Sequence, residues 1–195
     1  MNPLSLVVFA LLWTGIVYTL DSLIIGHFKK ISPKIALLYI ATVAMIGVFG
    51  EIFLDSIYNY FVGNPLWRYN ILPIHQAYTS AYAPVIWGIL GLHIYLIHDT
   101  LRGWGVRKTR TLAFIFSLEA LLLEALLTIS SKYLLGEYMY YYYPGDLWHV
   151  TSIQNMPFYF ICGVVVTLTV KRFKTSPRFF TVLCAFLVSV IVFFT

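Results

Sequence analysis

Four acidic residues lie inside long apolar stretches of the sequence, where an ionised carboxylate is costly. They are Glu51, Asp55, Glu119 and Glu124. Such a group must face other helices, find a partner or stay protonated. Glu51 and Asp55 are four residues apart, so they share one helix face, and a protonated acid beside an ionised one can serve as an acid/base couple. The alternative is structural: each acid bonds to a Tyr, Ser or Trp of a neighbouring helix and fixes the packing.

Two histidines, His75 and His149, follow the apolar stretches that carry Glu51 and Glu124. Together with the two Glu residues they offer ligands for a metal, a route for protons or axial ligands for a haem. Neither belongs to a short-spaced motif such as HxxxH or CxxC, so we predict no metal and no cofactor. The other interpretations are a His that caps a helix or bonds to a carboxylate, or a nucleophilic pair of His149 with Ser152, which no G-x-S-x-G motif supports.

Aromatic residues crowd the same regions, above all in the stretch GEYMYYYYPGDLWHVTS from residue 136 to 152. Tyr and Trp are enriched at a water–lipid boundary, and an aromatic belt accounts for most of them. Some of the rings can also line a site and stabilise a carbocation through their π faces. The residues predicted to contact a substrate are Trp67, Tyr69, Tyr142, Trp148 and Asn155.

The acids, histidines and tyrosines belong to an internal repeat. The ordered set Glu51, Tyr60, Gly63, Tyr69, His75, Thr79-Ser80, Pro84 and Gly91 recurs as Glu124, Tyr133, Gly136, Tyr142, His149, Thr151-Ser152, Pro157 and Gly163. The offset between matched residues is constant to within one position throughout. The repeat maps two helices onto the next two, over about 35–98 and 108–171, so both units run in the same direction about an axis near the membrane normal. Glu51 and Glu124 are then expected to face each other across an outward-opening cleft.

The Thr-Ser pairs of the repeat precede the third and fifth apolar stretches. Thr79-Ser80 and Thr151-Ser152 are predicted to act as N-caps, because a hydroxyl there accepts a bond from an unpaired helical N–H.

The composition indicates an integral membrane protein with an all-α fold. Hydrophobic residues make up 60% of the 195 residues and charged residues only 11%, against about 25% charged in a soluble domain. A membrane-spanning helix needs about 20 apolar residues, and backbone groups in lipid must bond within the segment. Six transmembrane helices are therefore predicted in one membrane domain over 1–195. Their approximate bounds are 4–26, 35–62, 78–98, 109–135, 153–171 and 178–195.

The basic residues predict the orientation. Eleven of the thirteen Lys and Arg residues lie in three short loops, 27–34, 99–110 and 171–178. These loops are expected to be cytoplasmic, so both termini and the two His-bearing loops are expected outside the cytoplasm. Charge confined to short loops is a topology signal, and we predict no nucleic-acid partner.

A longer motif runs through the first unit: E51…G63-N-P-L-W67-R-Y69…P84-V-I-W87-G88. It resembles the small multi-pass carotenoid hydratases and cyclases and the membrane-integral terpene cyclases, and it is also similar to a family of permeases. The resemblance to the cyclases implies that Glu51 and Glu124 protonate an epoxide or a double bond. This chain differs from those families by its paired histidines.

Three functions remain open from the sequence. The leading one is an enzyme for an isoprenoid or other lipid, with Glu51 and Glu124 as proton donor and acceptor and with Asp55, His75 and His149 as tuning or relay groups. The second is a proton-coupled transporter or lipid carrier built on the same repeat. The third is a membrane anchor or assembly subunit of a larger complex. The expected partner is a membrane lipid or lipophilic small molecule, with a homo-oligomer or membrane complex as further possibilities.

Overall fold

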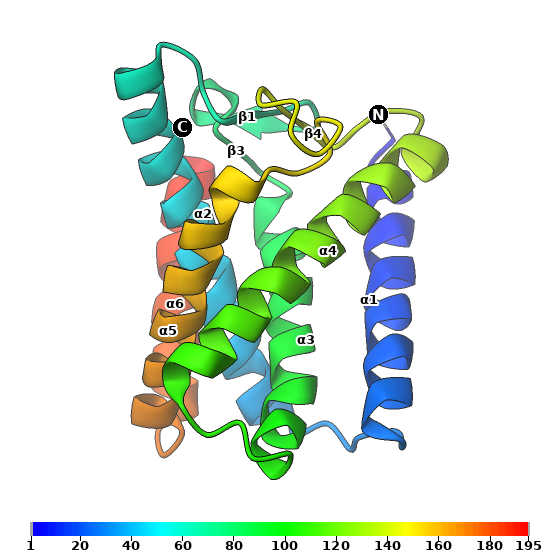
Figure 1. Cartoon of the computed structure of the whole chain (residues 1–195), viewed down its shortest axis with the longest axis vertical. Helices are drawn as coiled ribbons and strands as arrows, with labels where there is room; N and C mark the ends of the chain where they lie inside the picture. The colour runs from blue at the N-terminus through cyan, green and yellow to red at the C-terminus, as the bar shows by residue number, and fades with distance from the viewer. Residues whose placement is uncertain (1, 195) are drawn as a thin grey trace.

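The computed structural model describes residues 2–194, which form an all-α bundle of six helices (Figure 1). The helices are α1 (Pro3–Ile25), α2 (Pro33–Val62), α3 (Ala83–Gly103), α4 (Thr109–Leu135), α5 (Met156–Phe173) and α6 (Pro177–Phe193). All six predicted segments are helical, and α3 differs most, since it begins and ends five residues later than expected. Five helices are long and apolar enough to cross a membrane. The sixth, α6, has 17 residues and is slightly shorter than the usual span.

The outer surface of the bundle is apolar. Large hydrophobic side chains are more than half exposed on several helices, among them Leu11, Leu23, Phe53, Leu122 and Phe186. A surface of this kind is typical of helices that face lipid, and it supports a multi-pass membrane protein.

Two helix pairs form the centre, with α2 packed on α3 and α4 packed on α5. Each pair has a glycine at a close contact between the two backbones. A Cβ added to Gly91 would lie 2.8 Å from the Cα of Ile40, and one added to Gly163 would lie 2.9 Å from the Cα of Ala113. Both glycines therefore let two backbones touch where no larger residue fits.

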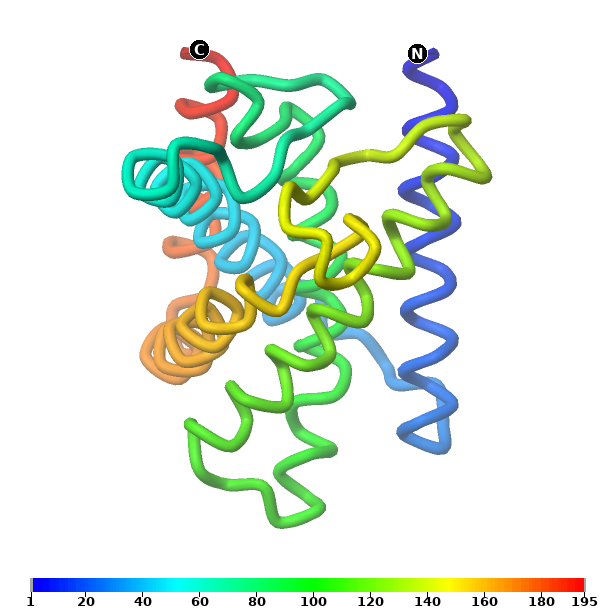
Figure 2. Tube along the Cα trace, turned by 45° about the horizontal axis from the view of Figure 1, so that its top comes forward, coloured from blue at the N-terminus to red at the C-terminus, as the bar shows by residue number. Residues whose placement is uncertain are grey.

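The remaining helices flank these pairs. Figure 2 shows α1 at one side of the bundle, next to α3 and the second half of α4, while α5 and α6 lie at the opposite side. The loops α1–α2, α3–α4 and α5–α6 all lie at one end of the bundle, here termed the basic-loop face (Figure 1). The other end carries both chain ends and the long loops.

Those long loops contain short strands that the sequence pattern did not predict. Strands β1 (Trp67–Tyr69) and β4 (Tyr140–Tyr142) pair antiparallel, and β2 (Pro73–Ile74) pairs with β3 (Thr79–Ser80). In the tyrosine run, Tyr140 and Tyr142 are buried while Tyr141 and Tyr143 are exposed. The alternation follows from the strand period of two, so only half of the run belongs to an exposed aromatic surface.

Candidate functional site

Glu51, in the middle of α2, is buried and fully hydrogen-bonded. One carboxyl oxygen, Oε1, accepts a hydrogen bond from the Tyr69 hydroxyl and one of 2.9 Å from Nε1 of Trp87. The other, Oε2, accepts from the Thr79 hydroxyl at 2.5 Å. Its donors come from α3 and from two of the strands, so this acid ties the loop end of the bundle to the helices.

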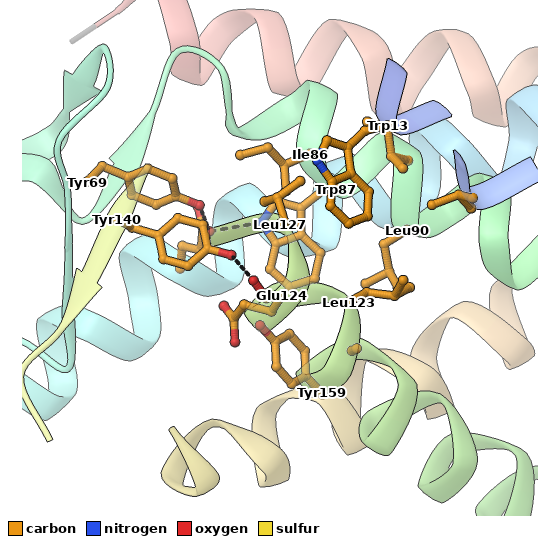
Figure 3. Close-up of a pocket in the computed structure, with 14 residues that line it drawn as sticks. Trp13, Tyr69, Ile86, Trp87, Leu90, Leu123, Glu124, Leu127, Tyr140 and Tyr159 are labelled. Carbon is orange, nitrogen blue, oxygen red and sulfur yellow. Dashed lines mark hydrogen bonds between the residues drawn. The ribbon is translucent and has the colours of Figure 1, made fainter. Parts of the chain in front are cut away.

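Glu124, on α4, is held in a similar way. The Tyr142 hydroxyl donates to Oε1 at 2.6 Å and the Thr151 hydroxyl donates to Oε2. Nδ2 of Asn155 donates to the Tyr142 hydroxyl at 2.8 Å, so the hydroxyl hydrogen of Tyr142 is committed to Glu124. The Tyr159 hydroxyl also points toward this carboxyl group (Figure 3).

The two acids have partners of the same kind at matching positions in the chain. The matched pairs, with the Glu51 partner first, are Tyr69 and Tyr142, Thr79 and Thr151, and Trp87 and Tyr159. The spacing along the chain is the same in all three pairs to within one position. The first two pairs were part of the sequence repeat. The third pair matches a Trp with a Tyr, so identical residues did not reveal it.

Both carboxyl groups line one cavity of about 50 Å³. Its polar end carries the two Glu residues with Tyr69, Tyr140 and Tyr159, and its other end is apolar (Figure 3). The apolar lining comes from α1, α3 and α4 and comprises Trp13, Val17, Ile86, Ile89, Leu90, Ala120, Leu123 and Leu127. The cavity therefore joins two carboxyl groups to an apolar passage between helices.

One donor in this apolar lining is unpaired. Nε1 of Trp13 is buried and has no hydrogen-bond acceptor among residues 2–194. Buried donors are nearly always paired with protein or with a bound molecule, so a ligand oxygen or a water is the expected partner.

The pKa of Tyr69 and of Tyr142, the two strand tyrosines that bond to the glutamates, is raised. Burial is the larger cause and the neighbouring carboxylate is the second. Both effects act on Tyr69 next to Glu51 and on Tyr142 next to Glu124, and each phenol has a pKa well above its usual value. Both hydroxyls therefore stay protonated at neutral pH and remain hydrogen-bond donors.

Three of the other residues predicted to bind a substrate have different surroundings. Trp67 and Asn155 line a smaller cavity of about 10 Å³ next to the glutamates, where Oδ1 of Asn155 has no partner within the described chain. Nε1 of Trp67 donates to the Tyr78 carbonyl at 2.8 Å. Trp148 lies on the surface with 84% of its area exposed, and it lines neither cavity.

Asp55 differs from the structural alternative, which expected a Tyr, Ser or Trp side chain of a neighbouring helix as its partner: its partners are backbone N–H groups that follow α2. Its Oδ1 accepts hydrogen bonds from the backbone N–H of Leu66 at 2.5 Å and of Trp67 at 3.4 Å. A similar bond follows α4, where the Ser131 hydroxyl accepts from the N–H of Met139 at 2.9 Å. Asp55 does not line the glutamate cavity.

The two predicted histidines lie away from the acids. His75 Nε2 is 3.1 Å from the carbonyl of Ile191, and His149 Nδ1 is 2.7 Å from the carbonyl of Tyr142. Neither lines the cavity. Ser152 donates to Asp146 at 3.0 Å, so it does not pair with His149. Within residues 2–194 no group of three His, Cys, Asp or Glu side chains is arranged to hold a metal.

The predicted N-caps need correction. Thr79 and Thr151 each donate to a glutamate, and neither begins a helix. Ser152 does cap the 3-10 turn that precedes α5, where its hydroxyl accepts from the N–H of Gln154. The Ser80 hydroxyl donates to the carbonyl of Ile71 and accepts, at 2.9 Å, from the N–H of Tyr82, the residue that precedes α3. Each Thr hydroxyl donates to a glutamate oxygen, and leaving such an oxygen without a donor would cost about 1–3 kcal/mol.

No protein-family model, curated protein or solved structure matches the chain. The resemblance of the motif around Trp67 and Tyr69 to cyclases therefore stays a prediction.

Proposed function

We propose that this chain is a multi-pass membrane enzyme that performs acid/base chemistry on a lipophilic molecule at Glu51 and Glu124. One observation carries the proposal: a buried carboxyl group on α2 (Glu51) and a partly buried one on α4 (Glu124) line a single cavity whose other end is apolar. An acid/base pair next to an apolar passage suits a substrate that arrives from the lipid and is protonated at one atom and deprotonated at another.

The proposal includes six spans, with α6 as the shortest, and a basic-loop face in the cytoplasm. Eleven of thirteen Lys and Arg residues belong to the three loops at that end. The glutamate cavity then lies nearer the extracytoplasmic face, beneath β1 and β4.

The internal repeat is part of the proposal as well. Three features support two parallel units related by an axis through the middle of the β1–β4 pair: the matching glutamate partners, the central register of the strands and the matching glycine contacts. Such units place equivalent acids on opposite sides of one cavity, as in transporters with parallel repeats.

The partners suggest different roles for the two acids. Nε1 of Trp87 can only donate, and with two hydroxyl donors it satisfies Glu51 as a carboxylate. The hydroxyl of Tyr159 can donate or accept, so it tolerates a proton on Glu124. We assign Glu124 as the proton donor and Glu51 as the proton acceptor.

The size of the cavity narrows the substrate class. About 50 Å³ holds a small group or a short piece of chain, against about 300–1,000 Å³ for a whole ligand. A second, apolar groove of about 280 Å³ lies between α1 and the end of α4. It is lined by Leu4, Ser5, Val8, Phe9, Leu12, Leu134 and Leu135. A molecule with one reactive end and a long apolar tail fits both features, which favours an isoprenoid or another lipid.

The corresponding reaction is an isomerisation or cyclisation. Glu124 adds its proton to a double bond or an epoxide, the cation rearranges, and Glu51 removes a proton from a neighbouring carbon. The rings of Tyr69 and Tyr140, which line the polar end, stabilise the positive charge. Atoms and charge balance, since one acid loses the proton that the other gains.

Native mass spectrometry of the full chain in mild detergent, with lipid extraction, tests the proposal. We expect a defined lipid to co-purify with the wild type and to be lost or chemically altered in Glu51→Gln and Glu124→Gln. The matched control is Glu137→Gln, since Glu137 is an exposed acid at the same end of the bundle. Unchanged lipid binding and an unchanged lipid product in both site variants would refute the proposal.

A proton-coupled transporter or lipid carrier is the second candidate, favoured by the matched acids of the two units. It predicts flux into liposomes that depends on a pH gradient, with no change in the transported molecule. A stoichiometric protein partner or a second copy in the mass spectrum, without any small molecule, would instead favour a subunit of a membrane complex.

A further inference from the structure

Asp21, His93 and Glu119 form a buried hydrogen-bonded group, here termed the His93 triad, outside the glutamate site. Nδ1 of His93 on α3 lies 2.9 Å from Oδ1 of Asp21 on α1, and Nε2 lies 3.3 Å from Oε2 of Glu119 on α4. Asp21 and His93 are almost fully buried, whereas the Glu119 side chain is 30% exposed. Ionisable groups from three helices at this depth are costly and typically functional.

The triad lies one helical turn from the lining of the glutamate cavity. The pairs, cavity residue first, are Val17 and Asp21, Ile89 and His93, and Leu123 and Glu119. Residues four apart on a helix lie on one face, about 5.4 Å apart along the axis. Helices α1 and α3 run toward the basic-loop face and α4 runs away from it, so all three steps lead in the same direction (Figure 1). The triad therefore lies between the cavity and that face.

The triad has no counterpart in the other unit. The positions that the repeat matches to His93 and Glu119 hold Val166 and Ile46, both apolar, and Asp21 precedes the first unit altogether. Apolar residues thus suffice for helix packing at this depth, and packing alone does not require the polar group.

Its hydrogen bonds suit the transfer of single protons. Both ring nitrogens of His93 face carboxyl oxygens, and an imidazolium between two carboxylates donates both bonds. Oδ2 of Asp21 is buried and unpaired in the part of the chain that the structure describes. A neutral ring with its proton on Nδ1 takes a second proton at Nε2 from Glu119, and the resulting imidazolium releases its Nδ1 proton to Asp21. One proton thus enters at Glu119 and one leaves at Asp21, and a flip of the ring restores the Nδ1–H tautomer for the next transfer.

We propose that the His93 triad is a proton relay between the basic-loop face and the Glu51–Glu124 pair. The inference rests on the proposed acid/base function, because each turnover leaves Glu124 without its proton and Glu51 with one too many. Glu119, the partly exposed member, exchanges protons with the solution at the basic-loop face. Water in the glutamate cavity carries them past the apolar layer of Val17 and Leu123.

His98 provides a matched control on the same helix. It is also buried, but its ring bonds to the hydroxyl of Tyr39 and accepts from Nε of Arg102 at 3.1 Å. Neither of these partners belongs to the triad, so a substitution there changes a buried α3 histidine and leaves the relay intact.

Infrared spectroscopy of the full chain in detergent tests the relay. Protonated carboxyl groups absorb in a separate carbonyl region, and a band that disappears in Glu51→Gln or Glu124→Gln reports the proton of the pair. After transfer to D₂O, this band shifts as deuterium replaces the proton. We expect the exchange to be slower by at least about tenfold in His93→Gln and in Glu119→Gln, since a positioned transfer group accelerates proton movement by about that factor or more. His98→Gln should exchange like the wild type.

The outcomes separate the relay from the function that it serves. If the wild-type spectrum has no band that depends on Glu51 or Glu124, neither acid holds a proton. The proposed acid/base function would then be wrong, and the relay with it. A normal band that exchanges as fast in both triad variants as in the wild type would overturn the relay alone. Glu119→Gln keeps an oxygen that accepts from His93 Nε2, so slow exchange in this variant cannot come from a misplaced ring.

Discussion

Arg68 and Tyr141 lie directly opposite each other in the antiparallel β1–β4 pair, and their separation along the chain equals that between Glu51 and Glu124. The same separation along the chain links Trp67 to Tyr140 and Tyr69 to Tyr142, although the sheet pairs these residues the other way round. Trp67 pairs with Tyr142, and Tyr69 pairs with Tyr140. An antiparallel pair maps onto itself by a twofold rotation through its centre, so the register agrees with the offset of the sequence repeat. The same strands place Tyr69 on Glu51 and Tyr142 on Glu124.

The hydroxyls of Tyr69 and Tyr142 are both expected to stabilise the fold. Each Tyr→Phe substitution removes one hydrogen bond to a glutamate carboxyl group, which should lower the free energy of unfolding by about 1.5–3 kcal/mol. Tyr142→Phe also removes the bond that Asn155 donates to the same hydroxyl, so its loss should be at least as large. Thermal unfolding in detergent measures the effect. Tyr141→Phe changes the exposed tyrosine between Tyr140 and Tyr142 and should be neutral. A large loss for one position and none for the other would contradict equivalent roles.

Alkaline titration should separate the tyrosines into two classes. Tyr69, Tyr140 and Tyr142 have a raised pKa because of burial and, after it, neighbouring carboxylates. An acid with a raised pKa in the folded state contributes stability below the unfolded pKa of about 10 and loses it as the pH rises further. Ultraviolet absorbance should therefore show a late ionisation step from these three buried tyrosines, above about pH 10, that coincides with unfolding. Complete ionisation near pH 10 without loss of helix would contradict the burial of these rings.

The glycine contacts should be intolerant of a single methyl group. Gly91→Ala and Gly163→Ala each place a Cβ within 3 Å of a backbone atom, at Ile40 and Ala113. Overpacking of this kind should cost about 1–3 kcal/mol, measured as a fall in the melting temperature. Gly15→Ala is the control, since nothing lies within 4 Å of its added Cβ and alanine favours a helix.

Asp55 should act through its oxygen and not through its charge. Asp55→Asn keeps an acceptor for the N–H of Leu66 and should fold like the wild type, whereas Asp55→Ala leaves that N–H unpaired and should cost about 1–3 kcal/mol. Thermal unfolding distinguishes the two variants. If Asp55→Asn abolished lipid turnover while preserving the fold, the charge of Asp55 would be needed for activity, as its predicted tuning or relay role requires.

The groove between α1 and α4 should select for tail length. Val8→Trp places a large ring in the groove and should reduce the retention of a long-tailed lipid by about tenfold, equivalent to about 1.4 kcal/mol. Leu23→Trp, on the exposed surface of the same helix, should leave retention unchanged. Native mass spectrometry compares the bound fractions, and equal retention in both variants would remove the groove from the substrate path.

The sequence predicted the helices well because length and apolar composition decide them. It also singled out Glu51, Glu124, Tyr69 and Tyr142, since their spacing recurs. The strand pairing could not be predicted, because three-residue strands are held together by partners in the other unit, far away along the chain. Contacts such as Asp21 with His93 could not be predicted either. Helices that are apolar both toward lipid and toward the core carry little periodic signal to show which face points inward.

In the proposed repeat, each unit supplies one strand of the β1–β4 pair and depends on the other unit for its partner strand. One unit alone would leave its three-residue strand without a partner, and a second copy of the same unit would complete it by symmetry. A protein of half this length would therefore have the means to build the paired glutamates as a homodimer, with two identical acids. If the proposed repeat arose by joining two such units, one chain no longer requires them to be identical. Asp21 of α1 has no counterpart at the other side, and the Trp87 ring lies beside the Tyr159 ring that the repeat matches to it. In the proposed repeat, a single chain thus allows one glutamate to differ from the other.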